Sequence, residues 1–467
     1  MTAGELTTSD LERLAKELGA DPHHKVLQNA LTRNQVDAVA LDHDVMVSAQ
    51  RSMSHQLDDW AVTDQQQSGR CWLFAGLNLL RVGAARELGV KDFEFSQNHL
   101  LFWDKLEKAN FWLEAVIETA SREVDDRTVA HLLTDPTGDG GQWNMFVALV
   151  RKYGLVPKSA MPETVASSST GQMNRDLTHV LRQAARDLRA RAASGDDVDQ
   201  LRAAKATLLS TVHRMLSLHL GTPPATVDWQ WRDKDKGFHR VGVLTPQEFA
   251  QRYVTLPLDD YVSLVDDPRA TSPRGRVFTV EFLGNVVDAP PVTYLNVEID
   301  LIKRLARESI VAGEPVWFGC DVDQMYEKDN GVWDAALYDY DAVYGTTTDL
   351  HKADRLLHGA TMMTHAMLLT GVDVIDRPEA AAAPEAPELP QAPEGSGEPV
   401  SRRWRVENSW GDKDADKGFH TMNDSWFAEH VFEIAVRRDA LPEHLRARLA
   451  DEPLVLPAWD PMGALAR

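Results

Sequence analysis

The stretch TDQQQSGRCWLF, residues 63–74, places a turn directly before an apolar helical pattern that begins at Cys71. Ser68 and Gly69 form the turn, and a thiol at a helix start meets unpaired N–H groups and the positive end of the helix dipole. Those conditions lower a cysteine pKa and populate the nucleophilic thiolate. Gln65 carries an amide that could donate a hydrogen bond to an oxyanion. Cys71 is therefore a candidate nucleophile, although a cysteine in such a helix is also often one more buried apolar residue.

The composition describes a large acidic protein with ample core material. Its 467 residues suffice for two or three domains, or for one large domain with insertions. Apolar residues make up 43% of the chain, which includes 13 tryptophans for the core. The formal net charge of −22 repels phosphate backbones and anionic membrane surfaces. We therefore expect neither nucleic acid nor a membrane surface as a partner.

Cysteine usage and the N-terminal residues favour a reducing compartment. The sequence has two cysteines, Cys71 and Cys320, which excludes a disulfide framework. Residues 1–20 are polar and charged and lack the apolar centre of a signal peptide. No apolar run approaches the roughly 18 residues of a membrane span. We expect a cytoplasmic protein, with no cofactor and no metal.

Helical patterns fill the first part of the chain. Residues 1–50 form an N-terminal arm whose first helix is amphipathic, with a capping box predicted at Ser9 and Glu12. We expect the arm to pack elsewhere on the protein or on a neighbouring subunit. Residues 51–171 form a helical domain that carries the candidate nucleophile. Its long helices are predicted at residues 71–88, 98–117 and 143–153.

Residues 172–276 are predicted to be a helical insertion and connection. Apolar residues repeat at helical spacing among many charges on both sides of a break at residues 194–197. This pattern predicts a helical hairpin that projects from the main body. The hairpin is a candidate oligomerisation element, and a pair of solvated helices is the simpler alternative.

Residues 277–450 have the composition of a β-rich domain. Its β-branched and aromatic segments predict strands, with an amphipathic helix at residues 299–312 among them. The strands are predicted at residues 277–280, 292–297, 315–319, 367–372 and 404–408. Residues 378–399 are rich in Pro, Ala and Glu and cannot pack a core, so we predict a disordered loop there. Residues 451–467 form a C-terminal tail.

Two strand ends of the β-rich domain carry the partners that a cysteine nucleophile needs. His365 begins an apolar strand, and Asn408 ends another. A histidine base and an orienting asparagine on one sheet, facing a helix-borne Cys71, would form a Cys-His-Asn site in an interdomain cleft. Alone, His365 is one strand histidine among 16, Asn408 a turn residue and Trp410 a core aromatic. Their joint pattern is what favours catalysis.

These segments together resemble the bleomycin hydrolase and aminopeptidase C branch of the papain-like cysteine peptidases. The resembling segments occur in family order and are Gln65, Ser68–Phe74, Pro315–Val322, Met363–Met367, Trp404–Gly411 and Leu456–Ala466. The resemblance implies an α+β papain-like fold, in which a helical domain and a β-barrel-like domain are accompanied by a helical insertion. His365 lies 294 residues after Cys71 (365 minus 71), where secreted papain-like enzymes have roughly 130–150. The insertion accounts for the excess, and the tract at 378–399 is a further insertion beyond the branch pattern.

The resemblance also implies a role for each site residue. Cys71 attacks the scissile carbonyl, and His365 pairs with the thiolate and then protonates the leaving amine. Asn408 orients the imidazole, and Trp410 shields that hydrogen bond from water. Gln65 and the Cys71 backbone N–H form the oxyanion hole, in which each donor is typically worth about 2.7–4 kcal/mol.

The substrate side of the site involves a glycine turn and the chain terminus. Gly140 and Gly141 resemble the turn that exposes backbone along the substrate cleft, whereas Cys320 is expected in the core. In the resembling family the tail lies in the cleft, and one terminal residue can be removed by the enzyme itself. Here that residue would be Arg467, which leaves Ala466 as the anchor. A carboxylate there would pair with the free amine of a substrate and select N-terminal residues, and a frayed terminus is the alternative.

The sequence therefore predicts a cytoplasmic cysteine aminopeptidase that acts on peptides, with bleomycin hydrolase-type amide hydrolysis as a side activity. By resemblance it should form a homohexamer with active sites that face an internal chamber. Two alternatives remain open: a cysteine endopeptidase and a non-catalytic peptide-binding chamber protein.

Overall fold

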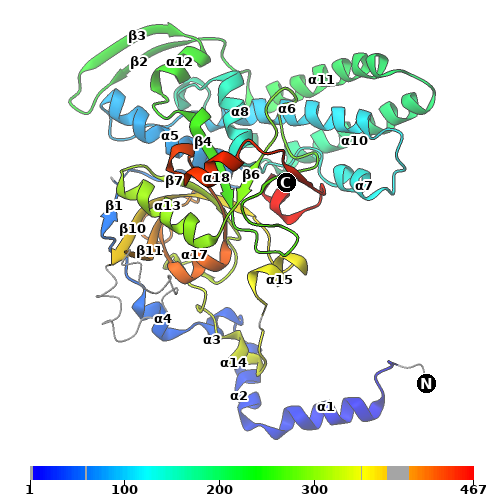
Figure 1. The fold of residues 1–467 in the computed structure, drawn as a ribbon, viewed down its shortest axis with the longest axis vertical. Coiled ribbons are helices and arrows are strands. Elements are labelled where there is room, and N and C mark those ends of the chain that lie inside the picture. The colour runs from blue at the N-terminus through cyan, green and yellow to red at the C-terminus, as the bar shows by residue number, and fades with distance from the viewer. Residues whose placement is uncertain (1–3, 58–59, 349, 376–398, 467) are drawn as a thin grey trace.

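The computed structural model describes residues 4–57, 60–348, 350–375 and 399–466. Figure 1 shows a layer of helices above a sheet, and an N-terminal arm that extends away from both. The arm helices are α1 (Thr8–Ala20), α2 (Pro22–Leu31), α3 (Asp37–Ala40) and α4 (His43–Ser48). The loop predicted at residues 378–399 lies outside the described residues, apart from Pro399.

Helix α1 begins two residues earlier than predicted. Thr7 is its N-cap, because the Thr7 hydroxyl accepts the Asp10 N–H and the Asp10 carboxylate accepts the Thr7 N–H in return. The predicted cap at Ser9 with Glu12 was wrong, since residues 7–10 offer four capping side chains in a row. The helix has no buried residue, so its apolar stripe is left open to solvent by the residues that the structure describes. Exposure is 55%, 45% and 58% at Leu11, Leu14 and Leu18.

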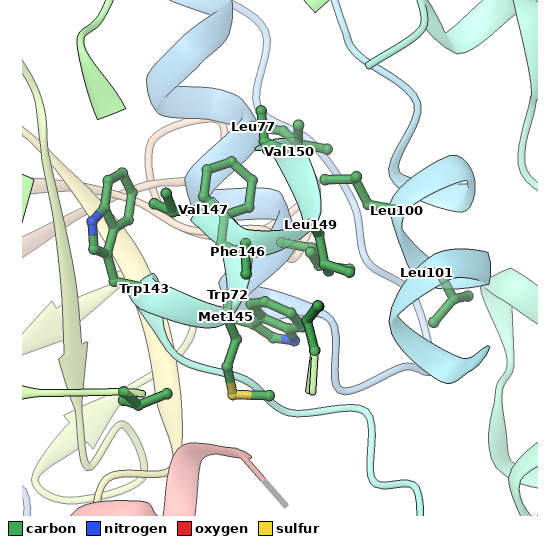
Figure 2. Packing of buried hydrophobic residues seen from close by; sticks show 14 of the residues in the cluster. Trp72, Leu77, Leu100, Leu101, Trp143, Met145, Phe146, Val147, Leu149 and Val150 are labelled. Carbon is green, nitrogen blue, oxygen red and sulfur yellow. The ribbon is translucent and has the colours of Figure 1, made fainter. Parts of the chain in front are cut away.

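The helical domain contains the predicted helices. Helices α5 (Cys71–Leu88), α6 (Gln97–Glu118) and α8 (Trp143–Tyr153) agree with the predicted ranges to within one residue, and α7 (Arg127–Thr134) is an additional short helix. Helices α5 and α8 approach closely, because a Cβ at Gly76 would stand 2.8 Å from the Phe146 ring. Figure 2 shows Val150 of α8 beside Leu77 of α5 in the same contact. This packing fixes the helix that begins at Cys71.

The predicted helical hairpin consists of α10 (Gly171–Ala193) and α11 (Val198–Leu220). Both helices pack against α6, and Figure 1 shows the pair running alongside the helical layer. The buried residues of the pair are Met173, Leu177, Leu181, Ala184, Ala185, Leu188, Leu201, Val212, Leu216 and Leu220. The apolar repeat of the hairpin is therefore buried by packing within the chain itself.

The rest of the insertion includes strands that we did not predict. β2 (Val227–Arg232) and β3 (Phe238–Leu244) form a separate antiparallel hairpin, and α12 (Pro246–Tyr253) follows it. The rings of Trp229 and Trp231 stack at 5.6 Å, and Trp229 Nε1 donates to the Tyr253 hydroxyl at 3.0 Å. In β2, tryptophan alternates with polar residues, and this alternation is the pattern from which the strand could have been predicted.

The central sheet has twelve strands within the described residues, in the order β14-β5-β6-β4-β13-β7-β10-β11-β12-β9-β8, with β1 paired to β10. The strand bounds are β1 His55–Gln56, β4 Tyr261–Val265, β5 Val277–Val280, β6 Tyr294–Asn296, β7 Val316–Cys320, β8 Tyr326–Glu327, β9 Val332–Trp333, β10 His365–Ile375, β11 Val400–Glu407, β12 Phe419–Asn423, β13 Val431–Arg437 and β14 Leu454–Leu456. β4 belongs to this sheet although it precedes the expected boundary at residue 277. The smaller helices are α9 (Val165–Ser168), α14 (Tyr340–Tyr344), α15 (Lys352–Leu357), α17 (Asp424–His430) and α18 (Glu443–Arg448).

The two faces of the sheet pack into different cores. Along β7, Trp317 belongs to the core shared with the helical layer, whereas Phe318 belongs to the core under α13 (Ile299–Val311). Successive strand residues point to opposite faces, so Gly319 faces the helical layer as Trp317 does. The sheet and the helical layer thus enclose the segments that carry the candidate site. In the part of the chain that the structure describes, no helix is long and apolar enough to cross a membrane.

Candidate active site

Cys71 is the first residue of α5 and is 3% exposed. The turn before it is held by Asp139, whose Oδ2 accepts the Gly69 N–H at 3.0 Å. Trp72 Nε1 donates to the Asp139 carbonyl oxygen at 2.7 Å. These two hydrogen bonds fix the start of the helix, where unpaired N–H groups and the helix dipole favour a thiolate.

His365 and Asn408 lie at neighbouring ends of the antiparallel strands β10 and β11, since His365 begins β10 and Asn408 directly follows β11. Asn408 Oδ1 lies 3.0 Å from His365 Nε2 and also accepts the Ser409 N–H at 2.8 Å. A backbone N–H can only donate, so the atom that faces His365 is the amide oxygen, and Nε2 carries the proton. The other ring nitrogen, Nδ1, remains for Cys71. The Trp410 ring covers the imidazole at a centroid distance of 5.1 Å.

The thiol and the imidazole stabilise each other as a charged pair. Burial opposes ionisation of Cys71, but the attraction of His365 and a hydrogen bond with its ring lower the pKa of the thiol below its usual range. Burial also opposes the imidazolium, yet the charge of Cys71 and the hydrogen bonds with Cys71 and Asn408 raise the pKa of His365. The opposite directions of the two pKa shifts favour a thiolate beside an imidazolium.

Gln65 is buried beside the same strand ends. Its Oε1 accepts the Ser409 hydroxyl at 2.6 Å, and its backbone N–H donates to the Ser409 carbonyl oxygen at 2.8 Å. Gln65 Nε2 donates to the Ser68 carbonyl oxygen at 2.5 Å. These bonds fix the amide plane and use one of the two Nε2 hydrogens, so one donor remains for an oxyanion.

The turn at Gly140 and Gly141 runs against the nucleophile helix. A Cβ at Gly141 would stand 2.4 Å from the Trp72 ring, so a larger residue would displace that ring. Asp139 makes the turn rigid. Burial opposes the charge of its carboxylate, but Lys105 at 2.6 Å and hydrogen bonds from Thr170 and Asn174 hold the pKa well below its usual range.

Sequence analysis did not single out the two lysines that support this turn. Lys105 pairs with Asp139, and Lys108 Nζ donates to the Gly138 carbonyl oxygen at 2.8 Å. Both lysines are buried on α6. The sequence could have indicated their role, because both lysines lie on the apolar face of a helix and a buried charge needs a partner.

The end of the chain, the tail segment η4 (Pro461–Ala466), lies against this region. The Met462 carbonyl oxygen accepts Gln142 Nε2 at 2.7 Å, directly beside the glycine turn. Leu465 Cδ2 would be 3.5 Å from a Cβ at Gly319, which pairs in register with Ala366, the neighbour of His365. Ala466 lines a cavity together with Lys108 and Gly138, and Arg467 lies outside the described residues.

Cys320 is fully buried in β7, as predicted. Burial and the neighbouring Asp321 raise its pKa well above the usual thiol range, which disfavours a second nucleophile. Among the described residues, no group of three or more His, Cys, Asp or Glu side chains could hold a metal ion.

Comparison with known proteins identifies the family. Residues 5–382 and 394–463 match the Peptidase C1-like family. Aminopeptidase C of Listeria monocytogenes is 41% identical over 462 residues, 99% of each chain. The bleomycin hydrolase of Gallus gallus is 39% identical over 474 residues, 100% of each chain. The crystal structure of PepW from Lactobacillus rhamnosis covers 99% of this chain and 100% of its own, at 42% identity and a TM-score of 0.92. Since the matches extend over almost the whole length, the chain has the papain-like α+β fold and belongs to the Peptidase C1-like family of cysteine peptidases.

Proposed function

We propose that this protein is a cysteine aminopeptidase that removes N-terminal residues from peptides. The observation that carries this conclusion is the buried pair of Cys71 and His365, with Asn408 on the far ring nitrogen at 3.0 Å. A relative that matches over 99% of each chain is named Aminopeptidase C, and this supports the same activity.

The chemistry follows from the geometry in two stages. The Cys71 thiolate attacks the carbonyl carbon of the scissile peptide bond. The oxyanion that forms accepts hydrogen bonds from the remaining Nε2–H of Gln65 and from the backbone N–H of Cys71. His365 then gives its Nδ1 proton to the leaving amine, which produces an acyl-enzyme. In the second stage His365 removes a proton from water, which attacks the acyl group and releases Cys71. Asn408 holds the imidazole in the required tautomer throughout.

The tail segment supplies the selection of N-terminal residues. Its backbone is hydrogen-bonded beside the glycine turn, and Leu465 lies next to the Gly319–Ala366 pair, so longer substrates cannot occupy that side of the cleft. After removal of Arg467, the carboxylate of Ala466 would attract the free amine of a substrate. Intact mass of the purified protein tests this processing step, because it distinguishes a chain of 467 residues from one that ends at Ala466.

We also propose hydrolysis of bleomycin-type amides, because the name of a full-length relative describes that activity. Assembly into a homohexamer is supported by the exposed leucines of α1, which no other part of the described chain covers. A cytoplasmic location is supported by the two free cysteines, Cys71 and Cys320.

A chain that lacks residues 464–467 tests the proposed activity together with a Cys71→Ala variant. The Cys71→Ala variant should lose hydrolysis of single-residue amides, and full activity in that variant would favour a non-catalytic peptide-binding protein. The truncated chain should lose amide hydrolysis and gain cleavage within longer peptides. Unchanged amide hydrolysis without internal cleavage would show that the tail does not select substrates.

A further inference from the structure

A cavity lies beside the C-terminal half of the nucleophile helix, away from Cys71. Its volume is about 540 Å³, within the range of about 300–1,000 Å³ that is typical of small-molecule sites. Its walls come from α5, from the segment that follows this helix, from the turn between β2 and β3, and from Trp60. A helix rises about 1.5 Å per residue, so Arg81, the first α5 residue of the wall, lies roughly 15 Å along the axis from Cys71. The cavity is therefore separate from the active site.

Positive charge converges on this cavity in a protein whose formal net charge is −22. The cationic side chains of Arg81, Arg86, Lys91 and Lys234 line it, and among the described residues no carboxylate does. Within the described part of the chain, the side chains of Arg86, Lys91 and Lys234 have no hydrogen-bond or ion-pair partner. Like charges that converge without partners repel one another, and an anion in the cavity would remove that repulsion.

The C-terminus of α5 does not need these cations. Cations are common at such an end, because the last carbonyl oxygens carry partial negative charge. Here the Leu88 carbonyl oxygen accepts Trp231 Nε1 at 2.9 Å. The Gly89 carbonyl oxygen accepts the backbone N–H of Lys234 at 2.9 Å. Neutral donors thus cap the helix end, which leaves the charged groups free for another partner.

Arg81 adds a buried guanidinium to the cavity. It is 5% exposed, and its Nη2 lies 2.6 Å from Glu407 Oε1. Its Nε has no hydrogen-bond partner among the described residues, so Glu407 does not use all the donors of the guanidinium. The planar guanidinium group is suited to the oxygens of a phosphate, which can accept more than one of its N–H groups.

Two aromatic rings, Trp60 and Phe93, line the same cavity. The indole N–H of Trp60 donates to Glu407 Oε2 at 2.6 Å, and the Arg81 guanidinium lies 5.8 Å from the Trp60 ring centroid. Phe93 makes an edge contact with Phe95 at a centroid distance of 4.9 Å. Fixed rings beside cations match a ligand that has a flat apolar body and a negative charge.

We propose that this cavity binds a small phosphate monoester in which the phosphate is attached to a flat apolar body. Such a phosphate carries a charge of about −1.5 to −2 at pH 7, so it matches several convergent cations better than a single carboxylate does. The phosphate pairs with the cationic side chains, and the flat body lies against Trp60 and Phe93. The site is independent of the proposed peptidase activity, because Cys71 and His365 take no part in it.

Isothermal titration calorimetry with 1-naphthyl phosphate tests this site. The full-length protein is first alkylated at Cys71 with iodoacetamide, which blocks anion binding beside the His365 imidazolium. We expect one binding site per chain. Affinity for 1-naphthyl phosphate should exceed that for inorganic phosphate and for 1-naphthol by about 10-fold or more, since each of these has only one half of the contacts. The affinity should fall as the salt concentration rises.

A pair of double variants assigns the binding to the cavity. Lys91→Gln/Lys234→Gln should weaken binding by about 10-fold or more, because two charge-assisted contacts are lost. Lys16→Gln/Lys236→Gln is the matched control and should bind as the unchanged protein does. It removes the same charge from two exposed lysines that do not line the cavity, and Lys236 lies in the same turn as Lys234. Without alkylation, both double variants should keep the hydrolysis of single-residue amides.

Three outcomes would contradict the proposal. Absence of saturable binding of 1-naphthyl phosphate would overturn the site. Equal losses in the two double variants would mean that the probe responds to the overall charge, which would also overturn it. Equal affinity for inorganic phosphate would overturn the assigned ligand class. The peptidase activity is tested separately by Cys71→Ala, so failure of this site and failure of that activity are distinguishable.

Discussion

Arg81 and Glu407 form a buried ion pair that joins the helix of the nucleophile to the strand that precedes Asn408. Arg81 Nη2 lies 2.6 Å from Glu407 Oε1, and the two side chains are 7% and 0% exposed. Asn78, on the same helix, donates to the same oxygen at 2.8 Å. Cys71 begins that helix and Asn408 follows Glu407, so the pair sets the spacing between the two halves of the active site.

Arg81→Met should destabilise the fold and lower activity together. The variant leaves Glu407 buried without its ion partner, and breaking such a pair costs about 3–5 kcal/mol in free energy of unfolding. Chemical denaturation of the purified variant measures this loss. The double variant Arg81→Met/Glu407→Met should recover most of it, and simple additivity of the two single losses would contradict the pairing. Arg13→Met is the control, because the Arg13–Glu17 pair is exposed and worth at most about 1 kcal/mol.

The opposite pKa shifts of Cys71 and His365 predict a bell-shaped pH profile of kcat/KM. Activity needs the thiolate and the imidazolium together, so it rises as the pH passes the lowered pKa of Cys71 and falls as the pH passes the raised pKa of His365. Asn408→Ala removes a hydrogen bond that raises the pKa of His365. The alkaline limb should therefore move to lower pH, in addition to a loss of kcat. Rates on a single-residue amide across pH measure both limbs, and an unmoved alkaline limb would argue against this role of Asn408.

Gln65→Ala should lower kcat by about 10²–10³-fold with little change in KM, because an oxyanion donor acts mainly in the transition state. Steady-state kinetics on an amino-acid amide give both constants. Gln67→Ala is a matched control, since this exposed glutamine lies on the same loop. An increase in KM at constant kcat would instead assign Gln65 to substrate binding.

Gly141→Ala should disturb the substrate turn through Trp72. The added Cβ would stand 2.4 Å from the indole ring, and such overpacking typically costs about 1–3 kcal/mol. We expect a lower Tm and a lower kcat/KM, because Trp72 follows the nucleophile directly. Gly19→Ala is the control, since an added Cβ in α1 would meet no atom within 4 Å. That variant should keep its activity and gain slightly in stability, because alanine favours helix.

The sequence by itself determined the elements that depend on neighbouring residues. Helix α5 could be predicted to the residue, because its apolar pattern begins at Cys71 and stops at Gly89, which adopts a left-handed conformation as C-cap. The segments around Cys71, His365 and Asn408 identified the family because they occur together and in order. Where the local signal was ambiguous, as at the cap of α1, the prediction failed.

Only the tertiary structure decided which distant groups meet. Asp139 holds the loop before Cys71, Arg81 pairs with Glu407, and Leu465 of the tail lies against Gly319 of β7. These contacts depend on strand register and helix packing between segments that are far apart in the chain. A one-residue shift of register would turn Gly319 to the opposite face of the sheet, so no local pattern could reveal that the tail meets this strand.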